Sequence, residues 1–342
     1  MRCRMLFQAC ATLLILLVTT GAGPADPLPS WSDGPAKQAI VAFVDRVTLP
    51  ISRDFVAKPE RIATFDNDGT LWTEQPLYNE MTFSVERVHE LAPRHPEWRT
   101  EEPFSSILAG DLQAAVASDR NIIQDVFAAT HSGMSVGAFA STVDTWLAKT
   151  RHPRFNRPYT ELVYQPMLEL LHYLRSRGFK TYIVSGGSTD FMRPWVERVY
   201  GIPPEQVIGS RLKLAFDLTG ERPELQLQPA LEFNDDGPSK PISIQQTIGR
   251  RPLAAFGNSD GDLQMLQWTT AGSGARFGLI VHHTDAEREW AYDRNSWIGH
   301  LAQALDEAPA HGWTVVDMKK DWRVIFPWQL RKGTSDGRQH QL

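Results

Sequence analysis

The stretch Arg61-Ile-Ala-Thr-Phe-Asp-Asn-Asp-Gly-Thr-Leu71 decides the fold. It begins as a short, mostly apolar run and changes abruptly into an acidic turn that contains glycine. A short apolar run bounded by turn residues is typical of a buried strand in a parallel sheet. Asp66 and Asp68 follow this strand at positions i and i+2, so both carboxylates can point into the crevice at the carboxyl edge of the sheet.

This pair of carboxylates suits phosphoryl transfer. Asp66 can attack phosphorus as a nucleophile and form an aspartyl-phosphate. Asp68 can protonate the leaving oxygen and then deprotonate water for the second step. A bare Asp-x-Asp-Gly sequence is also common in plain acidic turns. The apolar strand before the turn and Thr70-Leu71 after it favour a functional site.

The rest of the chain alternates between strand and helix patterns, which implies a mostly parallel sheet covered by helices on both faces. The predicted fold class is therefore α/β, a Rossmann-like parallel sheet, and the helical spacing between residues 83 and 149 predicts an inserted helical cap. Further strands are predicted at 179–184, 207–208, 252–256, 277–281 and 314–318, a hairpin within 212–233 that turns at 217–220, and helices at 39–47, 166–177 and 242–248.

These patterns divide the chain into parts. An α/β core is predicted over residues 23–73 and 160–330, and the helical cap over 74–159 is inserted between its first two strands. Within the core, residues 23–38 are predicted as an extended, proline-rich leader. Residues 331–342 are predicted as a disordered tail.

Three further segments carry polar groups in the order that this chemistry needs. Ser185-Gly-Gly-Ser188 follows a predicted strand, so its hydroxyl and backbone N–H groups can hold phosphate oxygens. Lys240 precedes a predicted helix and can neutralise a phosphoryl group and the nucleophile together. Gly257-Asn-Ser-Asp-Gly-Asp262 follows another strand and offers oxygen ligands, which Mg²⁺ prefers. Taken singly, a Ser-Gly-Gly segment is more often a plain βα turn, the lysine is typical of a solvated surface charge, and the last segment is typical of an acidic turn or a calcium-binding turn.

In this order the four segments resemble the four motifs of the haloacid dehalogenase superfamily, over residues 61–283. The resemblance is to its phosphoserine phosphatase-like branch, which has a helical cap between the first two motifs. That branch also places its lysine shortly before the fourth motif, as Lys240 stands here. The sequence is thus identified as a member of this superfamily, with a Rossmann-like fold as the expected architecture.

The resemblance implies a role for each matched residue. Asp66 is the expected nucleophile and Asp68 the expected general acid and base. The founding dehalogenases lack the second aspartate, so Asp68 argues for phosphate ester hydrolysis. The residues expected to hold phosphoryl oxygens are Ser185, Gly186 and Lys240, and the expected Mg²⁺ ligands are Asp66, Asp68 through its backbone carbonyl, Asn258 and Asp262.

One position departs from the family pattern. Asn258 stands where the family usually has aspartate. Its amide oxygen can still bind a metal ion, with Asp262 acting directly or from behind it. Asp260 is a further carboxylate that could supply the missing charge. The same segment also resembles the fourth motif of bacterial class B acid phosphatases.

The resemblance therefore predicts a Mg²⁺-dependent phosphomonoesterase that acts on a small phosphorylated molecule. Two alternatives stay open. One is a non-catalytic protein that binds a phosphate ligand on the same fold, which only Asn258 favours. The other is a phosphotransferase.

The N-terminus has the features of a secretory signal peptide, with two arginines before the apolar run 11–18 and small residues after it. This run is shorter than the roughly 20 apolar residues that a transmembrane helix needs. We expect a signal peptide over residues 1–22, cleaved after Ala22 or alternatively after Ala25, and no stable membrane anchor after cleavage. An uncleaved anchor is the alternative. The mature protein is then expected to be periplasmic or secreted.

The composition is that of an ordinary globular protein, with 42% hydrophobic and 22% charged residues. A net charge of −5 gives no basic surface of the kind that binds nucleic acid, so nucleic acid is not an expected partner. A homo-oligomer is compatible with the sequence.

Two clusters near the motifs have open interpretations. Trp72, Glu74 and Tyr78 follow the first motif, and aromatic rings beside a carboxylate suit either an ammonium group of a substrate or packing of the cap on the core. His282 and His283 end a predicted strand, where they could line the site or have a structural role.

Overall fold

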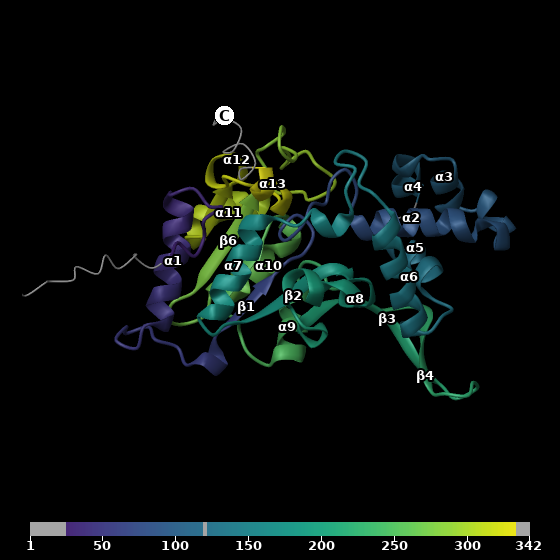
Figure 1. The fold of residues 1–342 in the computed structure, drawn as a ribbon. Coiled ribbons are helices and arrows are strands. Elements are labelled where there is room, and N and C mark those ends of the chain that lie inside the picture. Colours follow the sequence, from purple (N-terminus) through teal and green to yellow (C-terminus); the bar gives the residue numbers. More distant parts are fainter. Residues whose placement is uncertain (1–24, 119–121, 333–342) are drawn as a thin grey trace, which may run out of the picture.

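The computed structural model describes residues 25–118 and 122–332 (Figure 1). Its centre is a seven-stranded sheet with the order β4-β3-β2-β1-β5-β6-β7. Neighbouring strands are parallel except β3 and β4, which are antiparallel. The predicted α/β fold with a mostly parallel sheet is confirmed. The strands are β1 (Ile62–Phe65), β2 (Lys180–Ser188), β3 (Val207–Asp217), β4 (Glu224–Phe233), β5 (Ala254–Gly257), β6 (Phe277–His282) and β7 (Thr314–Asp317).

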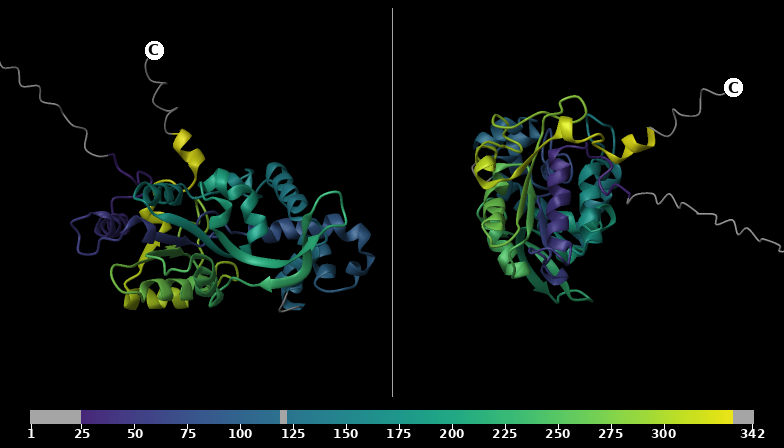
Figure 2. Two further views of the ribbon diagram at one scale, coloured as in Figure 1. Left: turned by 90° about the horizontal axis from the view of Figure 1, so that it is seen from below. Right: turned by 90° about the vertical axis from the view of Figure 1, so that its left-hand side faces the viewer.

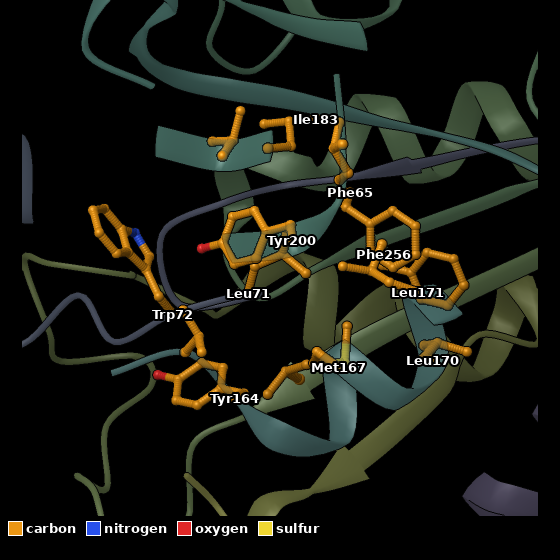
Figure 3. Packing of buried hydrophobic residues seen from close by; sticks show 14 of the residues in the cluster. Phe65, Leu71, Trp72, Tyr164, Met167, Leu170, Leu171, Ile183, Tyr200 and Phe256 are labelled. Atoms are coloured by element: carbon orange, nitrogen blue, oxygen red, sulfur yellow. The ribbon is translucent and has the colours of Figure 1, made fainter. Parts of the chain in front are cut away.

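β1 lies in the middle of the sheet, and all four of its residues are buried. Phe65 pairs in register with Ile183 of β2 and with Phe256 of β5. The rings of Phe65 and Phe256 stack with 4.3 Å between their centroids (Figure 3). Because these three strands are parallel and in register, the loops at their carboxyl ends meet at one edge of the sheet.

Helices cover both faces of the sheet (Figure 2). Adjacent residues of β2 separate the two layers, since Ile183 belongs to the core on one face and Val184 to the core on the other. The first layer contains α1 (Pro35–Thr48), α7 (Gln165–Ser176) and α8 (Thr189–Tyr200), and the second contains α9 (Ser239–Ile248), α10 (Leu263–Thr270) and α11 (Gln303–His311).

The segment before β1 is more tightly packed than the sequence predicted. Leu28 and Trp31 are fully buried in the core, and the expected extended leader over residues 23–38 is wrong for residues 35–38, which are helical. The first helix begins at Pro35, four residues before the predicted start. Proline suits the first turn of a helix because its fixed φ is already helical and its missing N–H has no partner there.

Six α-helices lie between β1 and β2 in the described part of the chain, and we call the first five of them the cap helices. The first four of these five helices surround a small core of their own that includes Val88, Trp98 and Val126, whereas the last one packs its buried residues into the main core. Figure 1 shows them at one end of the sheet, beyond the carboxyl end of β1. The division of the chain at residues 74 and 159 stays a prediction. The cap helices are α2 (Asn79–Leu91), α3 (Phe104–Leu108), α4 (Leu112–Ser118), α5 (Ile122–His131) and α6 (Val136–Lys149).

The β3–β4 hairpin reaches out of the sheet to meet these helices (Figure 1). Leu227 of β4 exchanges backbone hydrogen bonds with the turn between α5 and α6, donating to Met134 and accepting from Gly133. The hairpin itself was expected from the sequence. Its attachment to the cap helices was not, because a strand pattern gives no information on what the strand's outer edge contacts.

The chain ends on two short helices, α12 (Met318–Asp321) and α13 (Pro327–Lys332). The predicted disordered tail over residues 331–342 is therefore wrong for its first two residues, and the others lie outside the described residues, as does the predicted signal peptide over residues 1–22. Across residues 25–118 and 122–332, none of the helices combines the length and the apolar character needed to cross a bilayer.

Candidate active site

A cavity of about 610 Å³ opens at the carboxyl edge of the sheet, beneath the cap helices. Asp66 follows β1, Ser185 lies near the end of β2, and Asn258 follows β5. The parallel strands therefore bring three motifs together that are far apart in the sequence. The walls include the motif residues Asp66, Asp68, Ser185, Gly186 and Lys240, together with the cap residues Tyr78, Met81, Ile122 and Phe127.

Lys240 joins two of the predicted site residues. Its Nζ lies 2.7 Å from Asp66 Oδ1 and 2.6 Å from Asp262 Oδ1, and all three side chains are buried. Burial acts to lower the pKa of Lys240, but the charges of Asp262 and Asp66 outweigh burial and hold this pKa well above its usual value. Lys240 is in the first turn of α9 rather than before it, because that helix begins three residues earlier than predicted.

Asp262 is occupied by protein groups on both oxygens. Oδ1 accepts from Lys240, and Oδ2 accepts from the backbone N–H groups of Asn258 at 2.9 Å and Ser259 at 3.2 Å. This carboxylate therefore holds the lysine and the fourth motif in place. Asp262 was expected either to bind the metal ion directly or to act from behind Asn258. The arrangement fits the second role.

Asp68 is held by a tryptophan of its own loop. Nε1 of Trp72 donates to Asp68 Oδ1 at 2.8 Å. Trp72 is itself fixed by stacking on Trp195, with 4.4 Å between ring centroids, and lies in the core beside Leu71 (Figure 3). Burial raises the pKa of Asp68 to about 7; the Trp72 hydrogen bond opposes this rise and the charge of Glu80 adds to it. An aspartate with a pKa near neutrality can act both as acid and as base.

The carboxyl end of β2 is tied to the cap. Ser185 Oγ accepts from the backbone N–H of Gly187 at 3.1 Å, which closes a tight turn on the cavity wall. Ser188 caps the start of α8 and donates from its backbone N–H to Glu80 of α2 at 2.7 Å. His131 of α5 also contacts Glu80, at 3.1 Å. Glu80 was not predicted, since a glutamate on an amphipathic helix is usually solvated.

Asn258 lies within a hydrogen-bonded group on the opposite side from Lys240. Its Oδ1 accepts from Thr70 Oγ1 at 2.9 Å, and its Nδ2 donates to Glu74 Oε1 at 2.8 Å. The hydroxyl of Tyr292 donates to the same oxygen of Glu74 at 2.7 Å. The sequence analysis treated Trp72 and Glu74 as parts of one cluster. In the structure they have different partners, because Trp72 binds Asp68 whereas Glu74 binds Asn258. Sequence reasoning missed Tyr292, which lies in an irregular segment without a motif.

Asp260 caps a helix. Its carboxylate accepts from the backbone N–H groups of Ala302, Gln303 and Ala304, at the start of α11. Both of its oxygens are used in this way. These bonds support a helix-capping role for Asp260 in place of the expected compensation for the neutral side chain of Asn258.

His283 supports the nucleophile loop from behind. Its Nε2 lies 2.8 Å from the carbonyl oxygen of Gly69, and its Nδ1 lies 3.1 Å from Glu289 Oε2. Glu289 is fully buried and also accepts from Thr73 at 2.8 Å. Burial acts to raise the pKa of Glu289, but His283 and the hydrogen bonds outweigh burial and keep it below its usual value. Of the two interpretations of His283, the structural one is supported.

A model of the haloacid dehalogenase-like hydrolase family matches residues 63–267. The chain belongs to this family. The match begins in β1 and ends in α10, so it includes all four motif segments described above. No curated protein matches the chain.

Solved structures similar to this haloacid dehalogenase-like chain are distant in sequence, and at such identities they show the fold alone. A conserved protein of unknown function from Anaerococcus prevotii is 14% identical with a TM-score of 0.52, covering 80% of this chain and 88% of that one. A protein of unknown function from Bordetella pertussis is 15% identical with a TM-score of 0.48, covering 76% and 99%. A phosphoserine phosphohydrolase-like protein from Francisella tularensis is 16% identical with a TM-score of 0.36, covering 65% and 87%.

Within the described ranges of this haloacid dehalogenase-like hydrolase, no three His, Cys, Asp or Glu side chains are placed so that they could hold a metal ion by themselves. The donor set implied by the family is of another kind, because it includes the backbone carbonyl of Asp68 and here the amide of Asn258. Mg²⁺ in proteins is commonly held by one or two carboxylates, with waters and substrate phosphate completing its shell. The residues present fit a site of this kind.

Proposed function

We propose that this haloacid dehalogenase-like hydrolase is an exported, Mg²⁺-dependent phosphomonoesterase that acts through an aspartyl-phosphate on Asp66. The supporting observation is the position of Asp66 and Asp68 on one cavity wall, with Lys240 bonded to Asp66 and Trp72 bonded to Asp68. One carboxylate is thereby prepared for attack and the other for proton transfer. Export rests on the predicted signal peptide.

The proposed reaction has two steps. In the first, an oxygen of Asp66 forms a bond to phosphorus while the ester P–O bond breaks, and the departing alcohol oxygen takes a proton from Asp68. In the second, Asp68 takes a proton from water, the water oxygen bonds to phosphorus, and the bond between phosphorus and Asp66 breaks. Lys240 holds Oδ1 of Asp66 at 2.7 Å, which assigns the attack to the other oxygen in the proposed reaction.

The metal ion would be held by Asp66, the backbone carbonyl of Asp68 and the amide of Asn258. Bound there, Mg²⁺ would offset negative charge on the phosphoryl group. The charges of the site support such a cation. Asp66, Asp68 and Glu74 all line the cavity. Among the described residues that line it, Lys240 is the one with a positive charge.

The substrate is proposed to be a small phosphomonoester with one anionic group. A volume of about 610 Å³ lies within the range of small-molecule sites. Beyond the motif residues the wall carries the acidic side chains Glu80 and Asp236 and the apolar side chains Met81 and Phe127. A second phosphate or a carboxylate on the substrate would meet these acidic groups, so neutral or amine-bearing alcohol parts are favoured.

The test is a hydrolysis assay on the purified mature protein with Mg²⁺, using p-nitrophenyl phosphate, phosphoserine, phosphocholine and a bisphosphate. Wild-type protein should release phosphate. Asp66→Asn should fold normally and lose activity by about 10³-fold or more, because the amide is a far weaker nucleophile. Absence of hydrolysis across the panel, or full activity of Asp66→Asn, would refute the proposal.

Asn258 is the observation that favours the alternative of a non-catalytic phosphate-binding protein. Trapping of beryllofluoride on Asp66 separates the two, since the alternative gives phosphate binding without formation of an acyl-phosphate analogue. A phosphotransferase would transfer the phosphoryl group to an added alcohol, which analysis of the products would detect.

A further inference from the structure

Glu74 is a buried carboxylate with an unusual set of partners. It lies between β1 and α2, is 1% exposed, and still lines the cavity with Asp66 and Asp68. The donors that reach its Oε1 are the amide of Asn258 at 2.8 Å and the phenol of Tyr292 at 2.7 Å. Both donors are neutral. With neutral donors only, the ionised form of a buried carboxylate is costly unless a cation completes its surroundings.

The backbone around Glu74 is shaped to admit this carboxylate. Gly69 and Gly299 have φ values of 69° and 63°, a conformation that glycine adopts most readily. A Cβ atom at either position would overlap Glu74 Oε1. Two glycines from segments far apart in the chain therefore leave room for the same oxygen atom.

Glu74 also fixes the orientation of the Asn258 amide. An ionised carboxylate only accepts hydrogen bonds, so Asn258 must turn its Nδ2 toward Glu74. The amide oxygen is then directed to the other side, where it accepts from Thr70 of the nucleophile loop at 2.9 Å. With a donor in place of Glu74, the amide could rotate and present its nitrogen to that loop.

We propose that Glu74 is a positioning residue for the metal site. Through Asn258, Glu74 supplies the negative charge that the family usually carries on an aspartate at the position of residue 258. The charge has moved one hydrogen bond outward, from residue 258 to residue 74. Asn258 keeps an oxygen for the metal ion, and Glu74 both holds that oxygen in place and provides the charge. The inference rests on the proposed function only in taking Mg²⁺ as the bound cation.

The test begins with Glu74→Gln, which removes the charge but can keep an oxygen acceptor for Asn258 and Tyr292. Mg²⁺ affinity is measured by isothermal titration calorimetry on the full mature protein, and by the Mg²⁺ concentration that gives half-maximal hydrolysis of p-nitrophenyl phosphate. We expect both to weaken by about 10- to 100-fold, the usual effect of removing a group behind a metal ligand. The melting temperature in EDTA should not fall, because a buried charge has been removed.

The decisive variant is Glu74→Gln combined with Asn258→Asp. It returns the charge to residue 258, where the family keeps it, and should recover Mg²⁺ affinity by about tenfold or more over Glu74→Gln alone. Asn258→Asp alone places two carboxylates against each other and should lower the melting temperature in EDTA. Asp260→Asn is the matched control, because it removes one charge from the same motif but from the cap of α11, and its Mg²⁺ affinity should equal that of the wild type.

Wild-type affinity in Glu74→Gln, or a double variant that binds Mg²⁺ no better than Glu74→Gln, would overturn the inference, as would a wild-type protein that binds no Mg²⁺. Failure of the proposed function looks different. A protein that shows the expected pattern of Mg²⁺ affinities but hydrolyses no phosphomonoester retains this inference and loses the function. A protein that hydrolyses them with an unchanged Mg²⁺ requirement in Glu74→Gln retains the function and loses the inference.

Discussion

The two sides of the candidate site balance their charges differently. On the lysine side, Lys240 lies between Asp66 and Asp262, so a protein cation compensates the buried carboxylates. On the glutamate side, the side chains that donate to Glu74 within residues 25–118 and 122–332 are the neutral Asn258 and Tyr292. The lysine side thus has its cation within the protein, whereas the proposed metal site would draw the cation of the glutamate side from solution. The comparison predicts that damage to the lysine side unfolds the protein, while damage to the glutamate side changes what it binds.

The largest effect is expected for Lys240→Met. The variant leaves Asp66 and Asp262 buried against each other without their cation, which should lower the free energy of unfolding by about 3–5 kcal/mol. Hydrolysis of p-nitrophenyl phosphate should fall by about 10²- to 10³-fold or more, because the charge at the phosphoryl group is lost. Urea denaturation and a phosphatase assay measure the two effects.

A double variant, Lys240→Met with Asp262→Asn, separates stability from chemistry. It removes one of the two buried charges that Lys240→Met leaves without a cation, and it should recover part of the lost stability but none of the activity. If Lys240→Met alone were as stable as the wild type, the lysine side would not be an ion group of the kind described.

The lysine side could be predicted from the sequence, and the glutamate side could not. Asp66 and the fourth motif each follow a strand with a clear pattern, and a parallel sheet necessarily brings such strand ends together. Lys240 lies at the start of a helix that the sequence also predicts. Tyr292 and Gly299 lie between β6 and α11, in a segment without periodicity, and their contact with Glu74 depends on the tertiary path of that segment. The same limit explains Asp260, whose neighbours in the sequence are motif residues but whose partners belong to α11.

On the glutamate side, Tyr292→Phe removes one of the two donors to Glu74. A buried carboxylate that loses a hydrogen bond should lower the free energy of unfolding by about 1–3 kcal/mol. We expect this loss to be larger without Mg²⁺ than with it, because the cation then stabilises the carboxylate in place of the phenol. Thermal melts in EDTA and in excess Mg²⁺ make the comparison, and an equal loss in both would show that Glu74 does not respond to the cation.

A smaller change is expected for Trp72→Phe. This variant affects Asp68, the proposed general acid and base, which belongs to neither the lysine side nor the glutamate side. The indole N–H donates to Asp68 and opposes the rise of its pKa above the usual value to about 7. Without this bond the pKa of Asp68 should rise further, since the ionised form loses a donor. The first step needs protonated Asp68, so the alkaline limb of kcat/KM should move to higher pH, by about 1 pH unit. An unchanged profile would mean that Asp68 is not the group that titrates.

The smallest effect is expected for Asp260→Ala. This carboxylate belongs to the same motif as Asn258, yet it accepts from three backbone N–H groups at the start of α11. Loss of a helix cap should cost about 1 kcal/mol, visible in urea denaturation, while the Mg²⁺ affinity and kcat stay at the wild-type values. A fall in Mg²⁺ affinity as large as that of Glu74→Gln would mean that any carboxylate near the fourth motif serves the metal ion. Unchanged affinity would mean that the charge must lie on the glutamate side, within one hydrogen bond of Asn258.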